Sequence, residues 1–285
     1  MNDVSVALIS WNEKQTLDLC LKSLVDFADE IILVDTGSFD GTIKKAKRLY
    51  ENLGITGKII SEKTRSLGEA RFIAVKNCTY NWILLSDSNM VYGENIKKDF
   101  QKIIQTRKQA AMASLNLMGD YSHVFSPKPM NSHHLTLFMK DDVKWGNMVD
   151  RPTAKSRHMR KLKSWSVNLS RVRPAWRYWY RGEPFDPSNR DESGWKTSSN
   201  RQYHWTKQVE YPSIMEYVEH EENMTLEQVK SVAPRWMLKM LQSHAKPLST
   251  KQQHLLPETI KEEQKNPRYK LAYEGDTIIG RQPTL

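Results

Sequence analysis

The chain has 285 residues, of which 39% are hydrophobic and 27% are charged, so it can form one large domain or one domain with a substantial extension. No apolar run reaches the ~18 residues of a membrane span, and no basic stretch followed by an apolar one marks a signal peptide. We therefore expect a soluble globular protein. The net charge of +10 is localised, because residues 151–181 hold ten Lys and Arg and no Asp or Glu. A polyanionic partner is accordingly a hypothesis about this basic segment and not about the whole surface.

The two cysteines, Cys20 and Cys78, lie in apolar periodic segments and do not have the spacing of zinc ligands. This placement is typical of buried thiols in a reducing compartment, and we expect a cytoplasmic protein.

Short apolar runs alternate with amphipathic segments in the first part of the chain. Strands are expected at residues 4–10, 31–34, 58–61 and 82–86, with a helix after each of the first three. Asn12 and Gln15 resemble a capping box for the first helix, and Asp40 is well placed to cap the second. This alternation predicts a right-handed, mostly parallel α/β sheet.

Polar residues follow three of these strands, at 10–13, 35–40 and 87–89. Because ligands bind outside the carboxyl ends of strands in open α/β sheets, we expect the three clusters to form one site. Asp35 ends a buried strand and is followed by Gly37 and Gly41, which permit turn conformations. It can hold a ribose or base there, and the alternative is that it only caps a turn.

Four segments, VALISWNE (6–13), IILVDTGSFDGT (31–42), GEAR (68–71) and LLSDSN (84–89), resemble the family-2 glycosyltransferases with the GT-A fold, in the family's order and spacing. The resemblance covers roughly the first hundred residues and implies a nucleotide-diphosphate-sugar donor. By this resemblance the nucleotide-sugar contacts would be Ser10, Asn12, Glu13, Asp35, Arg71 and Asp87, with Arg71 near the diphosphate.

The resemblance also implies a divalent cation, Mg²⁺ or Mn²⁺, because Asp87-Ser88-Asn89 falls where the family has its Asp-x-Asp metal motif. Asn89 replaces the second acid of that motif and removes one negative charge, which should weaken metal binding. Three alternatives stay open: the metal binds only together with the donor diphosphate, basic residues partly replace it, or the segment is a strand-end turn without metal.

Later elements include a helix at 96–104, a strand at 110–118 and a strand at 133–138 that places His133 and His134 on opposite faces. Residues 143–150 resemble the family's acceptor-side segment, which implies Asp150 as the catalytic base. Other carboxylates compete for that role, namely Asp141, Asp142, Glu183, Asp186 and Asp191.

Aromatic residues are interleaved with the cations of the basic segment, a composition that suits phosphates, nucleobases and sugar faces. The predicted acceptor-binding residues are Arg173, Trp176, Arg177, Trp179 and Arg181. The alternative is a surface whose aromatics pack inward while the arginines stay in water. A capping box at Thr225 and prolines farther on predict a helical C-terminal part that ends in a short strand at 277–279.

The predicted organisation is a GT-A domain over residues 1–150 and an acceptor-binding region with a helical extension over 151–285. The expected reaction transfers a hexose with inversion to an acceptor hydroxyl, and the basic segment favours an anionic acceptor such as nucleic acid, through DNA modification, or a phosphate-bearing glycan. Two alternatives come from other classes. One is a sugar-phosphate nucleotidyltransferase, although the first strand lacks the glycine-rich basic signature of such enzymes, and the other is a nucleic-acid-binding protein with an inactive GT-A domain.

Overall fold

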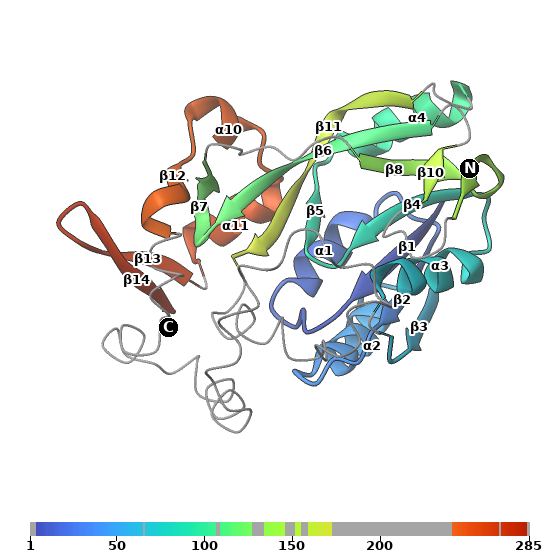
Figure 1. Cartoon of the computed structure of the whole chain (residues 1–285), viewed down its shortest axis with the longest axis horizontal. Coiled ribbons are helices and arrows are strands. Elements are labelled where there is room, and N and C mark those ends of the chain that lie inside the picture. The colour runs from blue at the N-terminus through green and yellow to red at the C-terminus, as the bar shows by residue number, and fades with distance from the viewer. Residues whose placement is uncertain are drawn as a thin grey trace. The chain divides into compact units, whose positions relative to one another are not determined.

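The computed structural model describes residues 4–64, 66–106, 109–126, 134–145, 152–154, 159–172, 241–267 and 269–283. These residues fall into two compact units, each described here by itself (Figure 1). Unit 1 contains the described residues of 4–114 and 134–166, and unit 2 contains those of 115–126, 167–172 and 241–283. Strands β6 (Gln109–Met118) and β11 (Met159–Arg171) begin in unit 1 and end in unit 2. The domain boundary predicted at residue 150 stays a prediction, since that residue lies outside the described ranges.

Unit 1 is built on four parallel strands in the order β4-β1-β2-β3. They are β1 (Val4–Ser10), β2 (Glu30–Asp35), β3 (Gly57–Ser61) and β4 (Trp82–Asp87). The helices between them are α1 (Leu17–Leu24), α2 (Thr42–Asn52) and α3 (Leu67–Asn77). Every residue of β1 and β2 is buried, because helices cover both faces of the sheet. The predicted α/β class and the mostly parallel sheet are confirmed.

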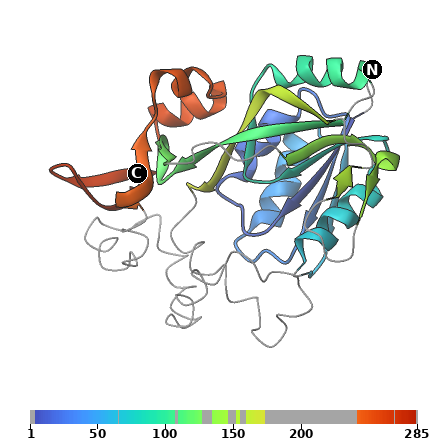
Figure 2. The same cartoon turned by 45° about the horizontal axis from the view of Figure 1, so that its top comes forward.

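The two faces of this sheet carry separate hydrophobic cores. Successive residues of a strand point to opposite faces, so Val6 and Leu8 pack with α1, α2 and α4 (Ile96–Thr106), while Ala7 and Ile9 pack with α3. The two layers of helices can be followed in Figures 1 and 2. Each core contains one cysteine, as expected of buried thiols. Burial raises the pKa of Cys20, and burial raises the pKa of Cys78 to about 12.

Antiparallel strands continue unit 1 beyond β4. Strand β8 (His134–Met139) pairs with β4 and β6, and β11 pairs with β6 and with β5 (Met90–Tyr92). A 3-10 turn, η1 (Lys140–Asp142), leads into the small pair β9 (Val143–Lys144) and β10 (Thr153–Ala154). The strand predicted at 133–138 is confirmed from His134 onward.

The sequence did not predict a strand within the basic segment, where the structure places β11. Leu162 is buried between the exposed Lys161 and Lys163, which is the alternation of a half-buried strand. The alternation of buried and exposed residues was missed because the charge of the lysines suggested only a solvated surface.

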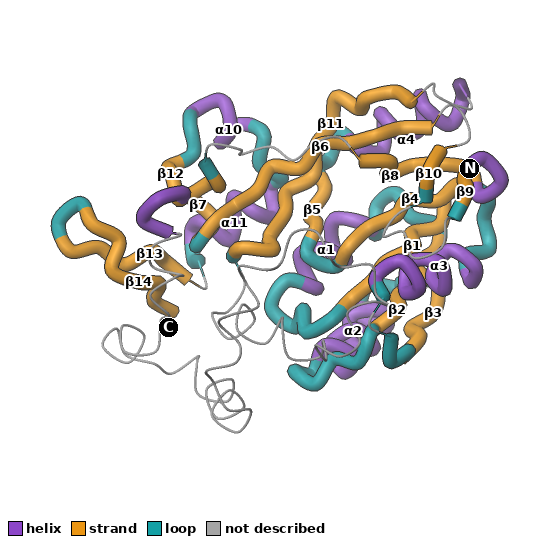
Figure 3. The backbone as a smooth tube through the Cα atoms, in the orientation of Figure 1, coloured by secondary structure: helices purple, strands orange, loops and turns teal. Residues whose placement is uncertain are grey.

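The described part of unit 2 contains strand segments, short helices and a hairpin (Figure 3). The end of β6 pairs with β7 (Asp120–Phe125), which in turn pairs with β12 (Ala245–Pro247). Helices α10 (Thr250–His254) and α11 (Glu258–Lys265) precede the hairpin of β13 (Tyr269–Glu274) and β14 (Thr277–Pro283). The helical C-terminal part is confirmed by α10 and α11, and the short final strand is the second arm of the hairpin. The capping box predicted at Thr225 lies outside the described residues. Within those residues, no helix has both the length and the apolar character to cross a membrane.

Candidate functional site

Three strand ends meet at the carboxyl edge of the parallel sheet in unit 1. Ser10 of β1 is in register with Asp35 of β2, and Ile9 of β1 is in register with Asp87 of β4. Asp35 and Asp87 therefore flank the end of β1 from its two sides. The convergence that the sequence predicted from separate segments is present in the folded chain.

Asp35 is 0% exposed and organises the turn that follows β2. Its Oδ1 accepts hydrogen bonds from the backbone N–H groups of Gly37, at 3.1 Å, and Ser38, at 2.8 Å, and its Oδ2 accepts one from the Ser38 hydroxyl. Burial raises the pKa of Asp35, while the bonds from Ser38 and Gly37 oppose that rise. Three of the roughly four lone-pair directions of the carboxylate are used in this way. Asp35 thus does cap a turn, and a role in holding a nucleoside stays a prediction.

Asn12 joins the loop after β1 to the turn after β2. It has a positive φ of 51°, its side-chain Oδ1 accepts a hydrogen bond from the Phe39 N–H at 2.9 Å, and its own N–H donates to Ser38 Oγ at 2.7 Å. The capping box predicted for Asn12 and Gln15 is wrong, because α1 begins only at Leu17 and its N-cap is Thr16. The loop between β1 and α1 is four residues longer than the pattern suggested, and Asn12 is used across loops instead.

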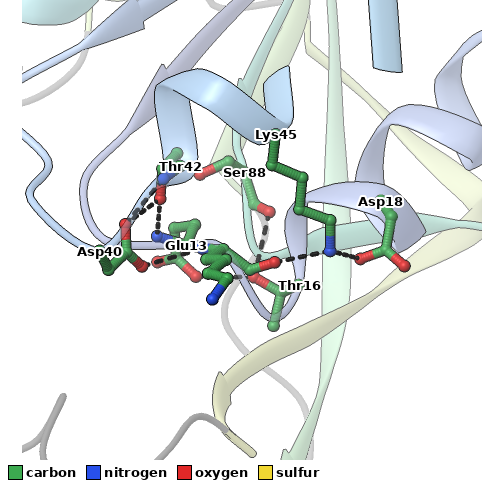
Figure 4. Close-up of polar contacts among 8 residues, drawn as sticks. Glu13, Thr16, Asp18, Asp40, Thr42, Lys45 and Ser88 are labelled. Atoms are coloured by element: carbon green, nitrogen blue, oxygen red, sulfur yellow. Dashed lines mark hydrogen bonds and ion pairs between the residues drawn. The ribbon is translucent and has the colours of Figure 1, made fainter. Parts of the chain in front are cut away.

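Glu13 lies at the centre of the hydrogen bonds between these two loops (Figure 4). Its backbone N–H donates to Thr42 Oγ1 at 2.8 Å, and its carboxylate accepts a hydrogen bond from the Thr16 hydroxyl at 2.7 Å. Asp40 accepts from the Thr42 N–H at 2.9 Å, and from the Lys14 N–H at 3.1 Å. Asp40 therefore stabilises the start of α2 as predicted, although Gly41 occupies the N-cap position.

An ion pair fixes the two helices that follow these loops. The Lys45 ammonium group lies 2.7 Å from Asp18 Oδ1 and donates to the Lys14 carbonyl oxygen at 2.6 Å (Figure 4). Lys45 is on α2 and Asp18 is on α1, so the contact holds the starts of both helices together.

Arg71 and Asp87 form an ion pair at the end of β4. One guanidinium nitrogen of Arg71 lies 2.7 Å from Asp87 Oδ1, and the two side chains are 3% and 30% exposed. The sequence predicted that Arg71 lies near a diphosphate, which stays a prediction, and the structure pairs it with Asp87. The buried Arg71 guanidinium thus fixes the direction of the Asp87 carboxylate. Asp87 is the more exposed of the two paired side chains.

The residues after β4 fit a divalent cation only as part of a larger ligand set. Asn89 is buried and its Oδ1 has no hydrogen-bond partner, so an amide oxygen two residues after Asp87 is available as a ligand. Oxygen ligands of this kind suit Mg²⁺ and Mn²⁺. Among the described residues, no group of three or more His, Cys, Asp or Glu could hold a metal. Asp87 and Asn89 therefore fit a cation that takes its other ligands from substrate phosphates and water.

The candidate base and the candidate acceptor contacts are not placed by this structure. Asp150 and the five acceptor-binding residues lie outside the described part of the chain, as do Glu183, Asp186 and Asp191. Asp141 and Asp142 are described, in η1. The Lys140 N–H at the start of η1 bonds the carbonyl oxygen of Asn81, just before β4 begins. These two carboxylates are thus at the opposite end of β4 from Asp87, which counts against a role for either as base.

Sequence reasoning missed three hydroxyl side chains that hold the site together, Thr16, Ser38 and Thr42. Ser38 and Thr42 lie within the segment that carries the family resemblance, next to the two glycines with positive φ, so turn chemistry could have singled them out. Thr16 carried no signal beyond its place three residues after Glu13, because its other partner, Ser88, comes from a distant part of the chain.

Comparison with known proteins identifies one matching family. The family model described as Glycosyl transferase family 2 matches residues 5–161, which is more than half of the chain. A cholesterol galactosyltransferase of Borreliella burgdorferi is 27% identical over 110 residues, which cover 38% of this chain and 29% of that protein. The chain therefore matches less than a third of the length of this curated relative.

Solved structures with detectable likeness include two of S. aureus TarS 1–349. The complex with UDP is 23% identical and covers 41% of this chain and 35% of that chain, with a TM-score of 0.34. A second structure of TarS 1–349 is 13% identical and covers 97% of this chain and 98% of that chain, with a TM-score of 0.41. The mannosyltransferase PcManGT from Pyrobaculum calidifontis in complex with GDP-Man and Mn²⁺ is 18% identical, covers 40% and 35%, and has a TM-score of 0.34.

Proposed function

This chain belongs to glycosyl transferase family 2, and we propose that it moves a sugar from a nucleotide-diphosphate donor to an acceptor hydroxyl. The family recognised from the sequence is confirmed by the match over residues 5–161, and the α/β fold class is confirmed by the parallel sheet. The finer parts of the proposal concern the donor, the stereochemistry, the cation and the acceptor. They are argued below from the residues that would carry them.

The observation that carries the proposal is the meeting of Ser10, Asp35 and Asp87 at one edge of the sheet. We assign the nucleoside to the side of Asp35, together with Ser10, Asn12 and Glu13, because buried polar groups there can accept ribose or base hydrogens. The diphosphate belongs on the side of Asp87. This order places the anomeric carbon of the donor beyond the end of β4.

The proposed chemistry is a single displacement with inversion. A carboxylate, for which Asp150 is the candidate, accepts the proton of the acceptor hydroxyl while that oxygen attacks the anomeric carbon. A divalent cation held by Asp87 and Asn89 would stabilise the negative charge of the departing nucleotide diphosphate. Arg71 holds the Asp87 carboxylate in place through the ion pair described above.

We propose a hexose as the donor sugar and an anionic acceptor. The support for the acceptor is the composition of residues 151–181, where ten cations occur without an acid. Arg173, Arg177 and Arg181 would meet phosphates, while Trp176 and Trp179 would stack on bases or sugars. Nucleic acid and phosphate-bearing glycans both fit this chemistry.

A binding panel tests the proposed function directly. At least one of UDP, GDP, ADP, CDP and dTDP should raise the melting temperature, and should do so more strongly with Mn²⁺ or Mg²⁺ than without. A ligand at about 100 times its dissociation constant stabilises a protein by about 2.7 kcal/mol, which thermal-shift measurements detect. The corresponding sugar nucleotide should then be hydrolysed slowly without acceptor. Strongly salt-dependent DNA binding with no nucleotide response would instead favour the inactive, nucleic-acid-binding alternative.

Asp35→Asn should weaken binding of the responsive nucleoside diphosphate by roughly 1.5–3 kcal/mol, the range for hydrogen bonds to charged groups. The amide oxygen can still accept from Gly37 and Ser38, so the turn is preserved while the charge is lost. Because the pKa of Asp35 is raised in the folded protein, its ionised form costs stability near pH 7, and the variant should melt no lower than the wild type. Asp26→Asn, at an exposed position after α1, is the matched control. Equal affinities in calorimetry for both variants would contradict the assignment.

A further inference from the structure

The backbone of Ser88 is hydrogen-bonded on both sides, to Ile9 at the end of β1 and to Thr16 in the loop that follows. Its N–H donates to the carbonyl oxygen of Ile9 at 3.0 Å, and its carbonyl oxygen accepts from the hydroxyl of Thr16 at 3.4 Å. Thr16 and Ser88 are each only 2% exposed, so water does not compete for these bonds. The turn between Asp87 and Asn89 is therefore positioned by residues some 70 positions away in the sequence.

The direction of the Asn89 side chain depends on this backbone contact. The Asn89 Oδ1 has no hydrogen-bond partner of its own that could fix it. The carbonyl of Ser88 and the N–H of Asn89 belong to one planar peptide unit, so a bond that fixes the carbonyl also fixes the direction of the Asn89 N–H and the position of the Asn89 Cα, from which the side chain starts. Thr16 thus acts on Asn89 only indirectly, through the peptide unit between Ser88 and Asn89.

The Thr16 hydroxyl has two acceptors and a single hydrogen. The Glu13 carboxylate oxygen lies 2.7 Å away and the Ser88 carbonyl oxygen 3.4 Å away, so the hydrogen favours Glu13 in the structure. Both contacts can be compared in Figure 4, where Thr16 lies between Glu13 and Ser88. A donor that bonded Glu13 Oε2, the oxygen to which Thr16 donates, would compete with Thr16 there and leave its hydrogen to Ser88.

We propose that Thr16 is a positioning residue that couples the nucleoside side of the site to Asn89. A nucleoside hydroxyl that donates to Glu13 turns the Thr16 hydrogen toward Ser88, which fixes the peptide before Asn89 and readies its amide oxygen for a cation. Nucleotide binding then tightens cation binding beyond the direct contact between diphosphate and metal. This inference rests on the proposed function, because it takes Glu13 as a nucleoside contact and Asn89 as a cation ligand.

The test compares Thr16→Val, which removes the hydroxyl at nearly constant shape, with Thr16→Ser, which keeps it. Thr16 is the N-cap of α1 but its side chain makes no capping bond, so the valine variant loses no helix cap. The dissociation constant of Mn²⁺ is measured by electron paramagnetic resonance, with and without the nucleoside diphosphate that responds best in the panel. The coupling factor is the ratio of the two constants. The direct contact between metal and diphosphate contributes equally in all three proteins and cancels in the comparison.

We expect the coupling factor of Thr16→Val to fall about fivefold below that of the wild type, the size of one net hydrogen bond, and that of Thr16→Ser to stay within twofold. With the nucleoside diphosphate bound, amide hydrogen exchange at Ser88 and Asn89 should accelerate in the valine variant only. Equal coupling factors in all three proteins, or a serine variant that behaves like the valine variant, would overturn the inference while leaving the proposed function intact. If no nucleoside diphosphate binds the wild type, the proposed function fails and the coupling fails with it.

Discussion

Asp87→Ala is expected to lower kcat/KM for sugar transfer by about 10²–10³-fold, the range for removing one preorganised group that stabilises developing charge. The substitution removes the carboxylate that would face the departing diphosphate and its cation. It also leaves the Arg71 guanidinium, whose side chain is 3% exposed, without its anionic partner. Stability should therefore fall as well, by about 2–3 kcal/mol, less than for a fully buried pair because Asp87 is 30% exposed.

Asp87→Asn separates the two effects. The amide oxygen can accept the hydrogen bond from Arg71, so urea unfolding should show a smaller loss of stability than in the alanine variant, while kcat/KM stays low. The double variant Arg71→Met with Asp87→Ala should regain part of the lost stability without regaining activity, since the unpaired buried charge is gone. If the asparagine variant transferred sugar at the wild-type rate, Asp87 would have no part in the chemistry.

Glu30→Ala is expected to destabilise the protein by roughly 3–5 kcal/mol without changing nucleotide affinity in the protein that remains folded. Glu30 is buried at the start of β2, the end opposite Asp35, and its carboxylate accepts hydrogen bonds from the Ser5 hydroxyl and from the N–H groups of Thr79 and Tyr80. The Ser5 hydroxyl and the Thr79 N–H lose this acceptor when it is removed, while the Tyr80 N–H keeps its bond to the Ser5 hydroxyl oxygen at 3.0 Å. The contacts also hold the turn before β4 against β1 and β2, so their loss weakens the whole parallel sheet.

The stabilising effect of Glu30 should depend on pH. Burial alone would raise the pKa of Glu30, but the hydrogen bonds from Ser5, Thr79 and Tyr80 outweigh it and hold the pKa below its ordinary value of 4.5. The contribution is therefore complete above about pH 4.5 and is lost as the pH falls through the lowered pKa of the folded state. Unfolding in urea between pH 3 and pH 7 should show this loss in the wild type and not in Glu30→Gln. Glu51→Ala, at an exposed position of α2, is the control that should leave stability nearly unchanged.

Local sequence patterns were enough to place the strand ends. Ile31–Val34 is too short for a helix and too apolar for a surface strand, so it had to be a buried strand that ends at Asp35. The positive φ values of Gly37 and Gly41 likewise follow from the absence of a side chain at turns that other residues avoid. Residues 10, 35 and 87 could be grouped because the carboxyl ends of parallel strands share an edge. The grouping needs only the strand order, and not the coordinates.

The sequence by itself determined the α/β class, the family and the edge of the sheet where the site lies, because hydrophobic period and turn chemistry act over a few residues. Only the tertiary structure decided the partners of the polar groups at that edge. Asn12 bonds the Phe39 N–H and not a helix end, Arg71 lies behind Asp87, and the Thr16 hydroxyl is shared between Glu13 and Ser88. Apart from the bond between Thr16 and Glu13, these contacts join residues 16 to 72 positions apart, and a buried polar group bonds whichever partner the packing of the helices brings within hydrogen-bond distance. No local pattern carries that information, since it arises only when α1, α2 and α3 have covered the two faces of the sheet.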